Sequence, residues 1–99
     1  MSMTQTGKLT LGSEHPVETQ GGDISTFTRV TFPSPFPPGS EVIVLAQVQT
    51  FNGPDTPGVR IANVTRTGFL IRLNELYGAN TLSDGVHAQE TVGWFASTV

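Results

Sequence analysis

Apolar and polar residues alternate along most of this chain with a period of two residues, not with the period of an amphipathic helix. β-Branched residues dominate the alternating runs, and such side chains favour strands over helices. Segments rich in proline, glycine and asparagine separate these runs. The pattern predicts strands and no helix of useful length. The expected strands cover residues 6–11, 25–32, 41–51, 59–64, 67–76 and 89–98.

Six short strands without a helix predict an all-β fold, a six-stranded antiparallel β-sandwich. Residues 42–45 (Val-Ile-Val-Leu) are apolar on both faces, which is typical of a central strand that is covered on both sides. Residues 33–40 contain four of the seven prolines, so they predict a connection without a regular ladder. The side chains expected to be mostly buried are Phe32, Val44, Leu45, Ile61, Phe69, Ile71 and Trp94.

The chain has 99 residues, which fits a single domain over residues 1–99. Its apolar content is 36%, with 11 glycines and 7 prolines, so a small core with many turns is expected. A core of this size predicts that partner subunits supply part of the stability. The second methionine, Met3, indicates that residues 1–4 are either disordered or an added leader.

Charge is sparse and slightly acidic. Only 13% of the residues are charged, the net charge is −3, and the five lysines and arginines never cluster, so nucleic acid is not an expected partner. The chain has no cysteine, which excludes a disulfide framework and a thiolate metal site. No apolar run approaches the length of a membrane span, and the N-terminus lacks the pattern of a signal peptide. Neither membrane insertion nor a cofactor is expected.

Catalytic motifs are absent from the sequence. The two histidines, His15 and His87, lie near acids, but no nucleophile elbow, zinc-protease helix or phosphate-binding glycine loop accompanies them. The prediction is that the protein is not an enzyme. Asp84 and His87, together with Glu90, could offer metal ligands from one loop, although loop acids more often bond to neighbouring backbone groups. The number of ligands is low for a hard cation, so no metal is predicted.

Two arginines lie on neighbouring expected strands. Arg60 and Arg72 both alternate with apolar residues, on the sheet face opposite Ile61 and Ile71, where they are predicted to be exposed to solvent or to face a partner chain. The planar guanidinium suits recognition of polar groups. The alternative is an exposed arginine that pairs across the strands with an acid such as Glu75.

Aromatic residues are candidate platforms for a ligand, because an apolar ligand face can pack on a ring. Tyr77 begins a glycine-rich loop and is the better candidate, whereas Trp94 is interpreted as a core or interface residue. Residues 63–65 (Asn-Val-Thr) match a glycosylation acceptor, but turn formation between two strands is the favoured interpretation.

Most of the chain resembles the H-type lectin family. The similar segments are residues 5–9 (Gln-Thr-Gly-Lys-Leu), residues 30–36 (Val-Thr-Phe-Pro-Ser-Pro-Phe), the Gly68-Phe69 turn and the closing Trp94. The resemblance implies a small β-sandwich that binds glycans of the galactose or N-acetylgalactosamine type as a trimer or a doubled trimer. It also implies an extracellular or surface location.

In that family the sugar lies at the junction between two subunits. One subunit contributes a glycine and an aspartate from the loop between its first two strands, and the other contributes an arginine and an aromatic or histidine residue. By resemblance, Gly22 and Asp23 occupy the first position, with Asp23 accepting from sugar hydroxyls. Arg60 or Arg72 would donate hydrogen bonds, and Tyr77 or His87 would cover the apolar sugar face. Counted along the sequence, the position of the family arginine falls nearer Thr56 than Arg60, which comes four residues later.

A different class of function also fits the sequence. A trimeric structural or receptor-binding module of a larger particle, or an accessory domain of a larger protein, would keep the sandwich without a sugar site. Glycan binding distinguishes this alternative from the lectin hypothesis.

Overall fold

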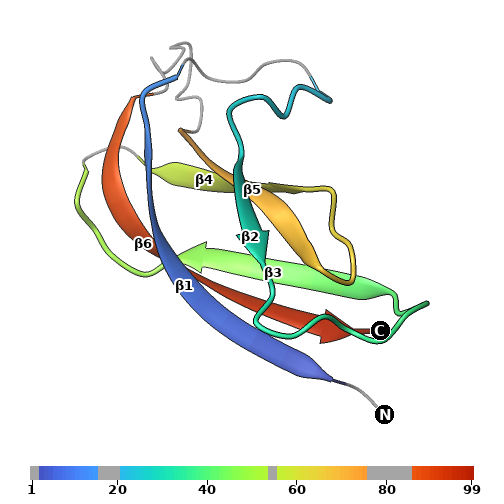
Figure 1. The fold of residues 1–99 in the computed structure, drawn as a ribbon. Helices are drawn as coiled ribbons and strands as arrows, with labels where there is room; N and C mark the ends of the chain where they lie inside the picture. The colour runs from blue at the N-terminus through green and yellow to red at the C-terminus, as the bar shows by residue number, and fades with distance from the viewer. Residues whose placement is uncertain (1–2, 16–20, 54–55, 76–85) are drawn as a thin grey trace.

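The computed structural model describes residues 3–15, 21–53, 56–75 and 86–99, and these residues form six strands and no helix (Figure 1). The strands pair into two antiparallel sheets with the orders β1-β6-β3 and β2-β5-β4. The predicted all-β antiparallel sandwich is therefore confirmed. The bounds are β1 (Thr4–Ser13), β2 (Thr28–Thr31), β3 (Val42–Val48), β4 (Pro57–Ala62), β5 (Gly68–Glu75) and β6 (His87–Thr98).

The bounds of all six strands differ from the prediction by one residue or more. β3 ends at Val48, three residues before the predicted end, and β4 begins and ends two residues earlier than predicted. β2 is shorter than expected because residues 24–27 form a turn, in which the Phe27 N–H donates to the Ile24 carbonyl oxygen at 3.1 Å. β1 begins earlier, and Met3 exchanges hydrogen bonds with Thr98, so residues 3 and 4 belong to the fold. β6 begins at His87, two residues before the predicted start.

Four aromatic side chains occupy the centre of the core. Phe32 lies 5.1 Å from Phe36, 5.8 Å from Phe69 and 5.6 Å from Trp94 between ring centroids. Phe69 and Trp94 meet edge to face at 5.5 Å, an arrangement that the charge distribution of aromatic rings favours. A Cβ atom on Gly7 would lie 2.5 Å from the Trp94 ring, so a glycine is needed beneath the indole.

Most of the predicted core residues are inside. Phe32, Phe69, Ile71 and Trp94 are buried as expected, and the core interpretation of Trp94 is confirmed. Val44 and Ile61 are half-buried against this core.

The prediction for Leu45 was wrong, because this side chain is 63% exposed. β3 is not a central strand: it lies at the edge of its sheet, and β6 lies between β3 and β1. The other sheet packs on only one face of β3, so Val42, Val44 and Ala46 point inward, whereas Ile43 and Leu45 remain on the outer face.

A tight turn joins β4 to β5, as the interpretation of residues 63–65 predicted. The Thr65 N–H donates to the Gly68 carbonyl oxygen at 2.9 Å, and Asn63 takes the left-handed backbone conformation with a φ of 51°. Asparagine tolerates this conformation better than most residues do. No helix in the described part of the chain is long and apolar enough to cross a membrane.

Candidate functional site

A hollow of about 240 Å³ lies between two segments that are distant in the sequence. Residues 21–24 and Phe27 form one wall, and residues 60–63 at the end of β4 form the other. The fold therefore brings together three of the predicted site residues, Gly22, Asp23 and Arg60, which line the same hollow.

Local hydrogen bonds shape the first wall. Asp23 Oδ1 accepts from the Ser25 backbone N–H at 3.0 Å and from the Ser25 hydroxyl at 2.8 Å. These bonds form an Asx turn, in which the aspartate side chain accepts from the backbone N–H two residues later. Gly22 precedes it with a φ of 95°, a conformation that a residue with a Cβ atom rarely adopts. Gly22 and Asp23 thus give the loop its shape, a role that comes in addition to the ligand binding implied for them by the resemblance.

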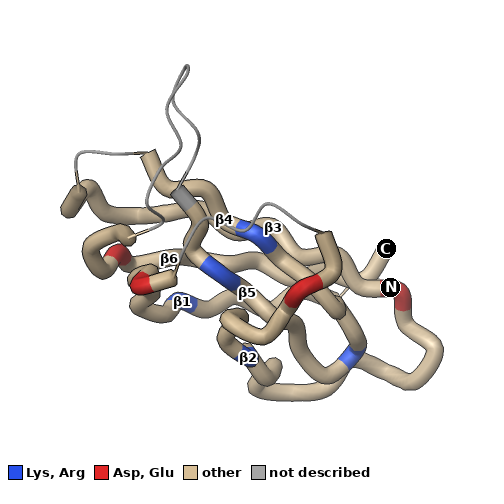
Figure 2. The backbone as a smooth tube through the Cα atoms, turned by 90° about the horizontal axis from the view of Figure 1, so that it is seen from above, with Lys and Arg blue, Asp and Glu red and all other residues tan. Residues whose placement is uncertain are grey.

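Arg60 and Arg72 lie directly opposite each other in the β4–β5 ladder, so both side chains belong to the outer face of that sheet. Figure 2 shows the two basic positions side by side on these strands. Arg60 is exposed and makes no hydrogen bond or ion pair in the described part of the structure. The side chain of Glu75, the acid expected as an alternative partner, lies outside the described part of the structure.

Arg72 is not exposed as predicted but only 5% accessible. Its Nη1 atom donates to the Thr26 hydroxyl at 2.8 Å, so the segment before β2 covers this part of the sheet. Arg72 does not line the hollow, and its contact with Thr26 gives it a role in positioning the wall that carries Asp23.

Sequence reasoning did not identify Asn63 as a site residue. This residue lines the hollow beside Arg60, is exposed, and has a side chain without a hydrogen-bond partner in the described structure. The sequence did contain a signal for its backbone conformation. Asparagine tolerates the left-handed conformation, and Asn63 lies directly after an expected strand and before the Thr-Arg-Thr-Gly segment. That signal indicated turn geometry and gave no information on what the carboxamide faces.

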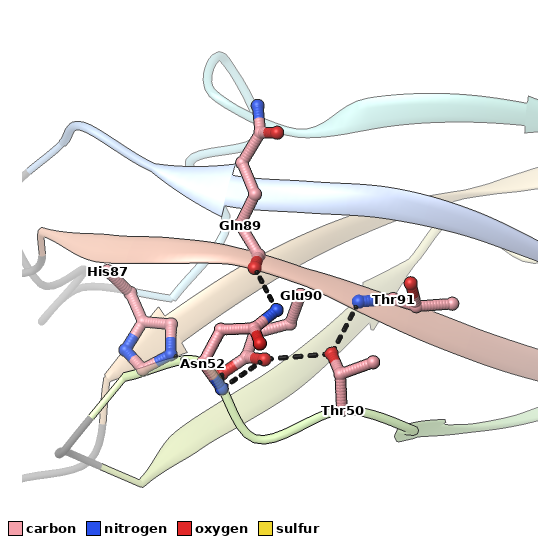
Figure 3. A network of polar contacts seen from close by, with 6 residues as sticks. All are labelled: Thr50, Asn52, His87, Gln89, Glu90 and Thr91. Atoms are coloured by element: carbon pink, nitrogen blue, oxygen red, sulfur yellow. Dashed lines mark hydrogen bonds and ion pairs between the residues drawn. The ribbon is translucent and has the colours of Figure 1, made fainter.

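His87 lies in a separate polar network (Figure 3). Its Nε2 atom is 2.9 Å from Oε2 of Glu90, and both residues are buried. The ring also lies against Gly53, where a Cβ atom would approach Cε1 to 2.8 Å. His87 does not line the hollow of Asp23 and Arg60. His87 is therefore a buried residue at the start of β6, whereas the sequence had predicted a loop residue.

Glu90 joins this network to the loop after β3. Its Oε1 atom accepts from the Thr50 hydroxyl at 2.8 Å and from the Asn52 backbone N–H at 2.9 Å. The Asn52 carboxamide also donates to the Gln89 carbonyl oxygen at 2.8 Å. The His87 hydrogen bond, followed by those from Thr50 and Asn52, holds the pKa of Glu90 below its ordinary value despite the opposing effect of burial.

Two expectations involve residues outside the described ranges. Tyr77, the predicted aromatic platform, and Asp84, the potential metal ligand, both fall in the gap at 76–85. Within the ranges that the structure does describe, no three histidine, cysteine or acidic side chains gather as metal ligands.

A second, shallower hollow of about 570 Å³ lies on the outer face of the β1-β6-β3 sheet. Gly93 leaves a gap in this face, with Leu45, Gln47, Gln49 and Phe95 around it. Ladder pairing places Leu45 and Thr6 on either side of Phe95 in one cross-strand row. Ile43, Leu45 and Phe95 are 49%, 63% and 40% exposed, so these three side chains form an uncovered apolar patch on this face.

The first hollow has the chemistry of a polar binding site. It combines a carboxylate, a guanidinium and a carboxamide with the apolar side chains of Ile24 and Phe27. No protein-family model, curated protein or solved structure matches the chain.

Proposed function

We propose that the chain is a multivalent carbohydrate-binding protein whose ligand occupies the hollow between residues 21–27 and 60–63. The observation that carries this proposal is the presence of Gly22, Asp23 and Arg60 in one hollow. Two of these residues come from the loop before β2 and the third comes from β4, so the proximity is a product of the fold.

The side chains of the hollow suit a sugar. A hydroxyl group is both a donor and an acceptor, so it can donate to the Asp23 carboxylate and accept from the Arg60 guanidinium. Ile24 and Phe27 supply apolar surface against which the C–H groups of a sugar ring can pack. The galactose or N-acetylgalactosamine class follows from the resemblance to H-type lectins. Tyr77 is the proposed ring cover, whereas the buried hydrogen bond of His87 leaves that ring out of the proposed contacts.

Assembly of identical chains is part of the proposal, with a trimer or a doubled trimer as the expected form. The resemblance implies sugar sites at subunit junctions, whereas the hollow joins Asp23 and Arg60 of one chain, so we place the sugar site within each copy. A second copy of the chain is the proposed cover of the outer face of the β1-β6-β3 sheet. Lys8 is the only charged residue that the described strands β1, β6 and β3 place on this face, so two copies of a chain with a net charge of −3 can approach there without strong repulsion. Burial of Ile43, Leu45 and Phe95 would stabilise the contact.

The same surface favours the alternative function of a non-catalytic structural or receptor-binding module. A sheet face that associates with other copies through its apolar side chains would allow the chain to assemble within a larger particle, even if the hollow bound no sugar. Glycan binding by the hollow decides between the two functions.

Substitutions at Asp23 test the site directly. Asp23→Ala should lower the affinity for a glycan by about tenfold to a hundredfold, because a hydrogen bond to a charged group contributes about 1.5–3 kcal/mol. Titration calorimetry with the parent and the variant measures this difference.

The matched control is Asp23→Asn, which retains an oxygen to accept from Ser25 but carries no charge. This variant should also bind weakly if the carboxylate contacts the sugar. Parental affinity in both variants, with the oligomer unchanged, would place the binding site elsewhere.

A further inference from the structure

We propose that the glycan carries a negatively charged substituent, a carboxylate or a sulfate group, and that Arg60 and Asn63 hold this group in the hollow. This inference rests on the proposed function and adds to it the chemical class of the ligand. It also assigns a ligand contact to Asn63, which the sequence had indicated only as a turn residue.

The first step concerns the charge of Arg60. The chain as a whole is acidic, yet this guanidinium is exposed and has no ion-pair partner in the described structure. A guanidinium presents several N–H donors in one plane, and that geometry matches two oxygens of a carboxylate or a sulfate. Asp23 lines the same hollow but forms no ion pair with Arg60, so the cation remains available to a ligand.

The second step concerns the neighbour of Arg60 in the ladder. Arg72 pairs directly with Arg60 in the ladder, but it is only 5% accessible and donates to the Thr26 hydroxyl at 2.8 Å. Arg72 does not line the hollow, so Arg60 is the guanidinium that a ligand in the hollow can contact.

The third step concerns Asn63, which lines the hollow three residues after Arg60. Its left-handed backbone, with a φ of 51°, interrupts the alternation of β4 and sets the direction of the carboxamide. The carboxamide N–H₂ group offers two donors, and neither is used within the described structure. A carboxamide beside a guanidinium adds donors without adding charge, which suits the remaining oxygen of an anionic group.

Asp23 completes the arrangement on the opposite wall. Its Oδ1 atom accepts two hydrogen bonds from Ser25, which fix the carboxylate on that wall. The carboxylate then accepts from a sugar hydroxyl, while Arg60 and Asn63 bind the charged substituent. The two walls thus bind different parts of one acidic sugar or of one sulfated sugar.

The test compares three glycans that share a terminal galactose unit: the neutral glycan, its sialylated form and its sulfated form. Intact parent oligomer is titrated with each at low and at high salt. We expect both charged glycans, or one of them, to bind at least about tenfold more tightly than the neutral glycan, with a preference that falls as salt rises. The sialylated and sulfated arms identify which anionic group the site accepts.

Asn63→Asp and Asn63→Gly form the matched pair of variants, because both residues tolerate the left-handed backbone. The new carboxylate of Asn63→Asp would pair with Arg60 and should abolish the preference for charged glycans over the neutral glycan. Asn63→Gly should reduce the preference about threefold to tenfold. Far-ultraviolet spectra and sedimentation confirm that both variants fold and assemble.

The possible failures are distinguishable. A parent that binds the neutral glycan as tightly as the charged ones overturns this inference and leaves the carbohydrate-binding function standing. An Asn63→Asp variant that keeps the full preference for charge also overturns it. A parent that binds none of the three glycans overturns both the inference and the proposed function.

Discussion

Glu90 shows how a single buried acid fixes two segments of this chain. Its carboxylate accepts hydrogen bonds from Thr50 and Asn52 of the loop after β3, and it bonds the ring of His87 at the start of β6. Burial of an ionised group is costly unless hydrogen bonds replace its hydration, and this carboxylate has three such partners. The network therefore holds the loop against β6 as long as Glu90 is ionised.

Stability should depend on pH through this residue. The pKa of Glu90 in the folded protein lies below its ordinary value of 4.5, so folding favours the ionised form. The resulting stabilisation is present above about pH 4.5 and is lost as the pH falls through the lower, folded-state pKa. Glu90→Gln should be less stable than the parent near neutral pH, and the difference should narrow in acid.

Urea unfolding of both proteins between about pH 7 and pH 3 measures that difference. Glu41→Gln, at an exposed position, is the control and should change stability little at any pH. A constant difference between Glu90→Gln and the parent over the whole range would show that the charge of Glu90 is not what stabilises the network.

Individual residues were predictable from the sequence to different degrees. The burial of Phe69 and Trp94 followed from their positions in alternating strands. The burial of Arg72 did not, because it depends on a contact across the fold with Thr26. The bond from Asp23 to Ser25 is local, and an aspartate in a glycine-containing loop is itself a turn signal. Asn63 gave a correct turn signal, but its place in the hollow depends on where residues 21–27 lie.

At the scale of elements, alternation predicted the strands well and their order poorly. The sequence of β3 is apolar on both faces, and the usual explanation is a strand inside a doubly covered sheet. In the structure β3 is an edge strand, because β6 pairs with both β1 and β3. Pairing between strands far apart in the sequence cannot be derived from the periodicity of one segment.

The exposed row on this sheet predicts the effect of a charge placed in it. Leu45→Glu would put a carboxylate directly beside Phe95 on the proposed contact surface. Because burial of an unpaired charge is costly, the oligomer should dissociate while the folded chain persists. Sedimentation of the parent and the variant at micromolar concentration measures the change.

Val64→Glu provides the control, since it introduces the same charge at an exposed apolar residue in the turn between β4 and β5. This variant should assemble like the parent. A parent that sediments as a stable monomer, or a Leu45→Glu variant that stays fully assembled, would contradict the proposed role of this sheet face.

At the scale of the whole molecule, the sandwich separates two surfaces. The outer face of the β1-β6-β3 sheet carries the exposed apolar side chains of Ile43, Leu45 and Phe95 among uncharged polar ones, whereas the other sheet carries the polar hollow with Arg60 and Asn63. This separation allows one sheet to associate with other copies while the other sheet contacts ligand. A shallow polar site binds a single sugar weakly, but several sites on one rigid body bind clustered sugars with high avidity.

The central claim is that the protein binds glycans through several identical sites, and binding of the parent protein to a glycan array printed at low and at high density tests it most directly. We predict strong capture on the dense spots and competition by soluble multivalent glycan at a concentration at least about a hundredfold lower than that needed for the free monosaccharide. An array on which the protein captures no glycan at either density would contradict the claim and favour the structural module.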